Sequence, residues 1–197
     1  KEEDNPAMAY VHNLGSVSNS GKEGFMMLGY DDIYSIEYMY EKRMGYWKHD
    51  GKVTIFDAFE KLRDNYQAIM ERCRAFDELI YDDAEKAGGK KYAEICSASY
   101  RQVISAHKLF TDKEGNLLWF SKENNSNGCV NTVDLTYPSA PLFLVYNPEL
   151  QKAMMTSIFE YSASGRWNKP FPAHDLGTYP IANGQVYGGD MPIEEGG

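Results

Sequence analysis

The clearest pattern along the chain is a run of apolar residues at alternating steps of four and three within residues 54–87. The positions are Ile55, Phe59, Leu62, Tyr66, Ile69, Cys73, Phe76 and Ile80. This spacing predicts an amphipathic α-helix, because it brings all of them to one helical face. Thr54 and Asp57 form a capping-box variant at its start, and Gly88-Gly89 supplies a left-handed stop at its end.

A second helix is predicted over residues 91–110, since small or apolar residues again share one side. They are Tyr92, Ile95, Cys96, Ser99, Val103, Ala106 and Phe110. A short turn between two long helices favours an antiparallel helical hairpin. The next string, LFTDKEGNLLWF, predicts a β-hairpin over residues 109–120 with its turn at residues 113–116.

The beginning of the chain is more polar. Residues 1–24 are rich in Ser, Asn and Gly and are expected to form a connector from a preceding domain. A helix is predicted to follow from about Tyr30, because Asp31 suits a helix N-terminus and Ile36 and Tyr40 fall on one face.

The second half of the chain contains one long loop and one well-marked helix start. A polar loop is predicted over residues 121–136, followed by the proline-containing string TYPSAP. Asn147 as N-cap and Pro148 at the first helical position predict a helix over residues 148–161. Helix, short turn, helix and long loop is the rhythm of an array of helical hairpins.

Composition narrows the partners and cofactors. The 197 residues are 43% hydrophobic, enough to bury one sizeable core. A net charge of −9 without any Lys/Arg cluster argues against nucleic acid as a partner, and no apolar run is long enough to span a membrane. Three cysteines without metal-ligand spacing predict no metal site, and no cofactor motif occurs. Of the three, Cys129 lies in a polar loop and is a weak nucleophile candidate, with no base beside it in sequence.

Two loops carry the candidate chemistry, and each contains an aspartate followed by a Tyr-Pro pair. These aspartates are Asp134 in VDLTYP and Asp175 in HDLGTYP. If the loops converge, the two acids could serve as a general acid/base pair, as could Asp175 with Glu194 or Glu195. The alternative is that both aspartates hold loops or cap helices through backbone hydrogen bonds.

Other residues of these loops suit substrate binding. His174 is either a base or a histidine satisfied by a loop carbonyl. Glu123 suits recognition of a carbohydrate or an amide, or else a solvated turn. Trp167 and Tyr179 could line a cleft for a small-molecule substrate, although core packing is the ordinary role of such residues.

Four strings together resemble the glutaminase A family of bacterial and fungal proteins. They are LGYDDIYSIEY, KYAEICSASYRQ, LLWFSKENNSNGCVNTVDLTYPSAPLFLVYNPEL and KPFPAHDLGTYPIANGQVYGGDMPIEE. The resemblance implies a mainly α fold, with helical hairpins of an (α/α) toroid like those of six-hairpin glycosidases and a small β-hairpin. It further implies a secreted or cell-envelope protein with other domains in the same polypeptide. Residues 25–197 would form the helical-hairpin domain, truncated at its C-terminal end.

The family name implies hydrolysis of the side-chain amide of L-glutamine to glutamate and ammonia. In that case an acid such as Asp175 would activate water or protonate the departing ammonia, and Arg101 or Arg166 could bind the substrate carboxylate. Two alternatives stay open, a glycoside hydrolase with paired carboxylates and a scaffold module without activity. An amidase site should hold ion-pairing groups for both ends of an amino acid, a glycosidase should have a longer aromatic cleft, and a scaffold should have no concave cluster.

Overall fold

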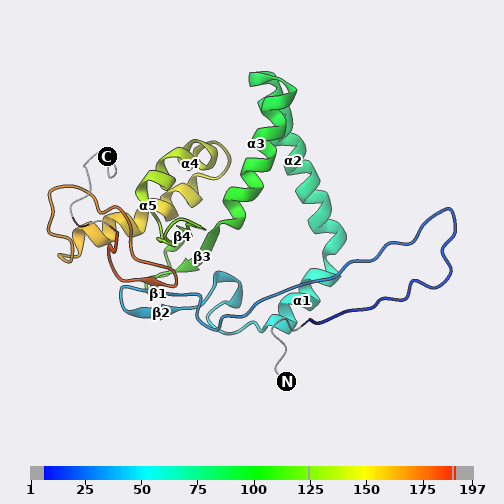
Figure 1. Cartoon of the computed structure of the whole chain (residues 1–197), viewed down its shortest axis with the longest axis horizontal. Coiled ribbons are helices and arrows are strands. Elements are labelled where there is room, and N and C mark those ends of the chain that lie inside the picture. Colours follow the sequence, from blue (N-terminus) through cyan, green and yellow to red (C-terminus); the bar gives the residue numbers. More distant parts are fainter. Residues whose placement is uncertain (1–6, 124, 188, 190–197) are drawn as a thin grey trace.

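The computed structural model describes residues 7–123, 125–187 and 189, and this part of the chain is mainly helical (Figure 1). A first set of helices comprises α1 (Ile55–Asp64), α2 (Tyr66–Gly88) and α3 (Lys90–Ser105). A second set comprises α4 (Val133–Tyr146) and α5 (Pro148–Ala163), which pack against each other. The predicted mainly α fold built from helical hairpins is confirmed.

Short strands form two small sheets between these helices. The first has the order β2-β1-β5, in which β1 (Ile36–Tyr38) pairs antiparallel with β2 (Glu41–Arg43) and parallel with β5 (Ile181–Ala182). The second is the hairpin of β3 (His107–Thr111) and β4 (Leu117–Ser121). The predicted β-hairpin is therefore confirmed, with Leu109 opposite Trp119.

The hairpin is buried on both faces, which explains why it carries so many large apolar residues. On one face Phe110, Leu118 and Phe120 are fully buried in a cluster with residues of β1, α5 and the closing loop (residues 164–187). On the other face Trp119 packs with Phe143 and other residues of α4 and α5. Because neighbouring residues of a strand point to opposite faces, the β3–β4 hairpin packs against β1 with one face and against α4 and α5 with the other.

The structure refines the long helix predicted over residues 54–87. Its capping box is present, since the Asp57 backbone N–H donates to the Thr54 hydroxyl and the Asp57 carboxylate accepts from the Thr54 backbone N–H. The helix is divided at Asn65, whose side chain donates to the Lys61 carbonyl and competes with the helical bonds there. The predicted second helix ends at Ser105, because the following residues extend β3.

Two predictions about local structure were wrong. The helix expected from about Tyr30 is instead loop and strand: Ile36 and Tyr38 are buried with a period of two, and Met39 and Tyr40 have positive φ. The loop expected over residues 121–136 is also shorter than predicted, because α4 begins at Val133 with Thr132 as its N-cap.

The helix α4 lacks the usual sequence signals of a helix. It contains Pro138 and Pro141, which normally end helices, and only Thr136 and Phe143 of its side chains are buried. The prediction of α5 is confirmed, because the Asn147 side chain caps it by accepting from the Leu150 N–H over 3.3 Å.

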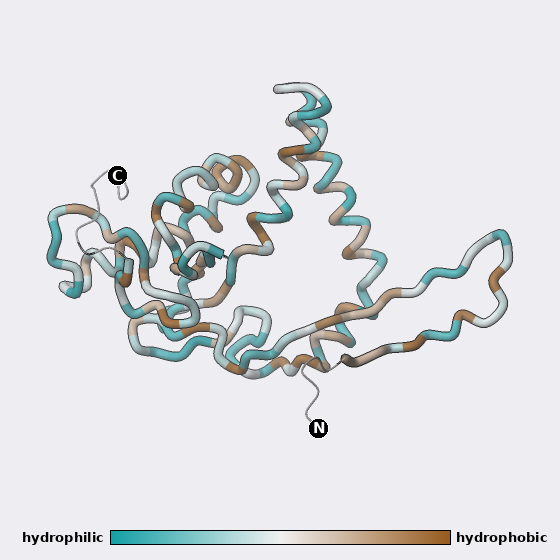
Figure 2. Tube along the Cα trace, in the orientation of Figure 1, coloured by the Kyte–Doolittle hydropathy of each residue, from teal (hydrophilic) through white to brown (hydrophobic). Residues whose placement is uncertain are grey.

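The α2–α3 hairpin extends away from the sheets, and residues 7–34 form an extended excursion without helix or strand (Figure 1). Hydrophobic and hydrophilic residues alternate along α2 and α3 (Figure 2), yet only Ile80, Ala84 and Ala93 of this helical hairpin are buried. Among the described residues, no helix is both long and apolar enough to cross a membrane.

Candidate functional site

The main candidate site is a pocket of about 710 Å³ where α3, the end of β4, the start of α4 and the closing loop meet. Its ionisable lining residues are His107, Lys122, Glu123, Asp134, His174 and Tyr187. This pocket thus brings together three of the predicted site residues, Glu123, Asp134 and His174, from segments that are far apart in the sequence. It is also the concave polar cluster that a scaffold module would not need.

Asp175 does not line this pocket, but it bonds to His174 and Tyr187, which do, and it organises the closing loop. Its Oδ1 accepts hydrogen bonds from the backbone N–H groups of Gly177 (2.8 Å) and Val186 (3.0 Å). Its Oδ2 accepts from the Tyr187 backbone N–H (3.1 Å) and from the ring of His174 (2.9 Å). With four bonds to a 1% exposed carboxylate, Asp175 is a fixed anchor rather than a group that faces substrate.

His174 is oriented by this anchor. A carboxylate only accepts hydrogen bonds, so Nδ1 of the neutral imidazole carries the proton and Nε2 holds the lone pair. Nε2 makes no hydrogen bond with any of the described residues, and the ring packs against Tyr187 at a centroid distance of 4.9 Å. The arrangement suits a general base whose free nitrogen serves the pocket.

Cys129 is brought to the same cluster, although the sequence showed no base beside it. Its sulfur lies within 4.8 Å of a nitrogen of His174 and an oxygen of Asp175. The thiol is 1% exposed, and burial together with the negative charge of Asp175 raises its pKa to about 12. A thiol in this environment stays protonated at neutral pH, so the geometry does not favour Cys129 as a nucleophile.

Cys129, His174 and Asp175 also form the one group, in the part of the chain that is described, whose donor atoms could surround a metal ion. Soft sulfur, imidazole nitrogen and carboxylate oxygen together suit zinc. However, both oxygens of Asp175 are already occupied by the four hydrogen bonds described above. Hydrogen bonding therefore accounts for the cluster, and the expected lack of a metal stays a prediction.

The two carboxylates that line the pocket, Glu123 and Asp134, differ in their hydrogen bonding. Glu123 is half-buried and accepts a hydrogen bond from the Ser126 hydroxyl, while its backbone N–H donates to the Cys129 carbonyl over 2.9 Å. Asp134 is exposed in the first turn of α4, where the helix dipole favours its charge. Its carboxylate makes no hydrogen bond with a described residue, so Asp134 is available to a ligand.

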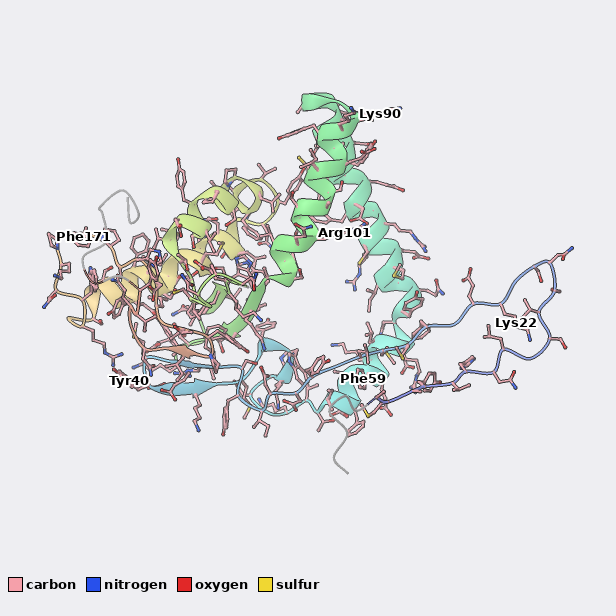
Figure 3. The ribbon with its side chains drawn as sticks, viewed as in Figure 1. Lys22, Tyr40, Phe59, Lys90, Arg101 and Phe171 are labelled. Atoms are coloured by element: carbon pink, nitrogen blue, oxygen red, sulfur yellow. The ribbon has the colours of Figure 1, made fainter. Side chains whose placement is uncertain are left out.

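The predicted arginines lie elsewhere. Arg101 lies on the α2–α3 hairpin, where its guanidinium forms an ion pair with Asp77 of α2 (Figure 3). Arg166 stacks on Tyr40 at 4.9 Å and lines a second pocket of about 510 Å³. Neither guanidinium lines the pocket of His174, so Lys122 is the one lysine or arginine among the described residues that line it.

The aromatic residues predicted to line the site, Trp167 and Tyr179, do not line this pocket. Trp167 packs against the core and donates from its indole N–H to the carbonyl of Phe171, a residue labelled in Figure 3. Tyr179 lies near the pocket's edge, where the Lys122 ammonium sits 4.7 Å from its ring centroid. Glu194 and Glu195 lie outside the described residues.

Sequence reasoning missed several pocket residues, chiefly His107, Ser121, Lys122 and Tyr187. A signal for two of them was available in the sequence. If the register of the predicted β-hairpin is continued away from its turn, His107 comes to lie opposite Ser121. No comparable signal existed for Tyr187, which reaches the pocket through a loop shaped by Asp175.

The fold and pocket define a helical-hairpin domain with an acid- and histidine-lined site, and comparisons with known proteins identify its family. A family model described as the glutaminase A six helical-hairpin domain matches residues 89–197. The chain therefore belongs to the glutaminase A family. A second model, for a domain of unknown function (DUF5127), matches residues 1–83, so the two matches meet near the α2–α3 turn. The division predicted at residue 24 stays a prediction.

Two fungal proteins are similar to the chain. A protein named glutaminase A from Aspergillus oryzae is 34% identical over 200 residues, which cover 98% of this chain and 29% of that protein. A protein from Arthroderma benhamiae, named as a probable glutaminase, is 36% identical over 118 residues, which cover 58% of this chain and 14% of that protein. The chain thus spans less than a third of either relative. No solved structure matches it.

Proposed function

We propose that this chain supplies the catalytic pocket of a glutaminase that hydrolyses the side-chain amide of L-glutamine to glutamate and ammonia. The observation that carries the proposal is the His174–Asp175 pair, which leaves one imidazole nitrogen as a base in a pocket that is also lined by Glu123 and Asp134. The names of the two relatives support the same activity. A pocket of about 710 Å³ is within the usual range for small-molecule sites.

The pocket offers a group for each part of the substrate. Free glutamine has an α-ammonium group, an α-carboxylate and a neutral carboxamide. Asp134 and Glu123 suit the ammonium, and Lys122 suits the carboxylate. The carboxamide then lies toward His174.

The reaction follows from these positions. His174 accepts a proton from water at Nε2, and the resulting hydroxide adds to the carboxamide carbon. Asp175 stabilises the imidazolium that forms, as a buried carboxylate does in a catalytic triad. The carbon–nitrogen bond then breaks, and the proton returns from His174 to the departing nitrogen, which gives ammonia and a carboxylic acid. The acid loses its proton to ammonia, so that glutamate and ammonium leave the site. Asp175 therefore acts through His174, as a positioning residue.

One observation favours the glycoside hydrolase alternative, since two carboxylates, Glu123 and Asp134, line a single pocket. Against it, Tyr187 is the one Trp, Phe or Tyr among the described residues that line the pocket, whereas a glycosidase cleft is usually lined by several aromatic rings. The amidase is therefore the first proposal. From the family resemblance we also propose that the polypeptide contains other domains. We propose further that it is secreted or attached to the cell envelope.

The test is ammonia release from L-glutamine by the full-length protein, measured beside hydrolysis of a panel of aryl glycosides. His174→Gln should lower glutamine turnover at least 100-fold, because it removes the base. His12→Gln is the matched control, since His12 is exposed and outside the pocket. Turnover of glycosides with inert glutamine would favour the glycosidase, and inactivity on both would favour a scaffold.

A further inference from the structure

Two side chains of the pocket wall lie opposite each other across the β3–β4 hairpin, and each has a polar atom without a hydrogen-bond partner among the described residues. His107 and Ser121 are register partners in the antiparallel pair, and both line the pocket. His107 Nε2 and Ser121 Oγ are both buried, and neither bonds to a described residue. Directly opposed residues of an antiparallel pair have Cβ atoms about 5 Å apart, so one small ligand group can serve both.

A buried polar atom without a partner destabilises the folded chain, because it loses its hydrogen bond to water and gains none in return. Two such buried atoms on neighbouring strands of one pocket wall are therefore unusual. Ser139, on the same wall, shows the contrast, because its hydroxyl donates to the carbonyls of Leu135 and Thr136. The unpaired atoms of His107 and Ser121 indicate that a polar ligand completes them.

The chemistry of that ligand follows from the tautomer of His107. Its Nδ1 lies 2.6 Å from the Val103 carbonyl oxygen, which can only accept, so Nδ1 carries the hydrogen. Burial against Trp119 and Phe143 lowers the pKa of His107 and keeps the ring neutral. Nε2 is consequently an acceptor that requires an N–H or O–H donor, while the Ser121 hydroxyl can donate to a carbonyl oxygen.

We propose that His107 and Ser121 form a binding subsite for a primary carboxamide. The amide N–H donates to Nε2 of His107, and the amide oxygen accepts from the Ser121 hydroxyl. This inference rests on the proposed function for the identity of the whole substrate, but it assigns the group that the subsite selects. The subsite discriminates against the product, because a carboxylate has no N–H and presents negative charge to a lone pair.

The test compares two ligands that differ only at this group. L-Glutamine has a carboxamide, whereas L-glutamate γ-methyl ester keeps the carbonyl oxygen and lacks the N–H. Binding is measured by calorimetry on the full-length protein in a His174→Gln background, so that turnover is suppressed. The subsite predicts that glutamine binds at least 10-fold more tightly than the ester.

Variants then separate the two hydrogen bonds. His107→Phe keeps an aromatic ring beside Trp119 and removes Nε2, so the preference for the amide should fall to within twofold. Ser121→Ala should weaken both ligands about 10-fold, since both use the carbonyl. Ser139→Ala is the matched control and should change neither by more than twofold. If His107→Phe fails to fold, the contrast between Ser121→Ala and Ser139→Ala still decides the proposal.

The outcomes also separate this inference from the proposed function. A preference that persists in His107→Phe, equal effects of the two serine variants, or no binding of glutamine would overturn the subsite. Ammonia release by the unmodified protein would support the glutaminase whichever way the binding test falls. Conversely, a His107-dependent preference for glutamine in a protein that releases no ammonia would support the subsite and overturn the glutaminase.

Discussion

His174 donates a hydrogen bond from Nδ1 to Oδ2 of Asp175, its neighbour in the sequence, over 2.9 Å. Adjacent residues rarely point the same way. Here they do because the backbone N–H groups of Gly177, Val186 and Tyr187 turn around the carboxylate and hold it in place. One side chain therefore shapes the loop and sets the tautomer of the candidate base.

Asp175→Asn should impair both functions. The amide nitrogen of the introduced asparagine cannot accept a hydrogen bond. At least one N–H group that now donates to Asp175 would therefore face another donor. We expect about 2–3 kcal/mol loss of unfolding free energy and a fall in glutamine turnover of at least 100-fold. His174→Gln should lower turnover similarly with a smaller loss of stability, because the backbone bonds to Asp175 remain. Urea unfolding and ammonia release measure the two effects, and equal stability of both variants would contradict the anchoring role.

Gly177 is the residue of this loop that tolerates substitution least. A Cβ there would lie 2.2 Å from the Ile181 carbonyl oxygen, and its φ is +132°. Gly177→Ala should therefore destabilise the protein by about 3 kcal/mol or more. The control is Gly165→Ala, where φ is +76° but no atom lies within 4 Å, so about 1 kcal/mol is expected. Similar unfolding midpoints for the two variants would contradict the close approach.

Cys129 should resist alkylation although it lies in a loop. Burial and the charge of Asp175 raise its pKa to about 12, so almost no thiolate exists at pH 8.5. Cys73 is exposed and should react with iodoacetamide under these conditions. Peptide mass spectrometry over a time course measures the two rates, and comparable modification of both cysteines in the folded protein would show that the thiol is accessible and ionised.

The Cys129 thiol should make the free energy of unfolding fall as the pH becomes alkaline. Its folded pKa lies above the unfolded value of about 9, so between these values the unfolded chain binds fewer protons than the folded one. The contribution is fully present below pH 9 and is lost as the pH rises toward 12. Cys129→Ala should therefore flatten the fall in unfolding free energy over this range, whereas Cys73→Ala should leave it unchanged.

Asn131 joins the loop after β4 to α5. Its buried side chain donates to the Met154 carbonyl (3.0 Å) and the Ser157 hydroxyl (2.9 Å), and its φ is +52°. Asn131→Ala should cost about 2–3 kcal/mol in lost hydrogen bonds, plus about 1 kcal/mol for the left-handed backbone. Asn131→Gly loses only the bonds, so it should be the more stable of the two in denaturant titration. The reverse order would show that the backbone conformation carries no cost.

The sequence predicted the elements whose signals are local. The capping box of Thr54 and Asp57, the β-hairpin turn and the Asn147-Pro148 start of α5 each depend on a few neighbouring residues, and all are present. The helix α4 was missed because its prolines mimic a loop and its apolar residues have no helical period. The segment from Tyr30 was misjudged because its many aromatic residues, which are enriched in strands, obscured the difference between a helical and a strand period.

The pocket was predictable in part. Glu123, Asp134 and His174 were chosen for their chemistry, and the fold brings them to one cavity. Arg101 and Arg166 were chosen for charge alone, and their positions depend on helix packing that no local pattern encodes. The same holds for Cys129, which meets His174 only because Val130 pairs with Leu176 and Gly177 through backbone hydrogen bonds.

By itself, the sequence determined the family, the order of most helices and the loops that carry the chemistry, because these follow from short-range spacing and from whole strings of residues. Only the tertiary structure decided which of those side chains share a pocket, that Asp175 anchors His174, and that His107 and Ser121 stand unpaired together. These relations depend on contacts between segments distant in the chain, where backbone hydrogen bonds and core packing fix each position.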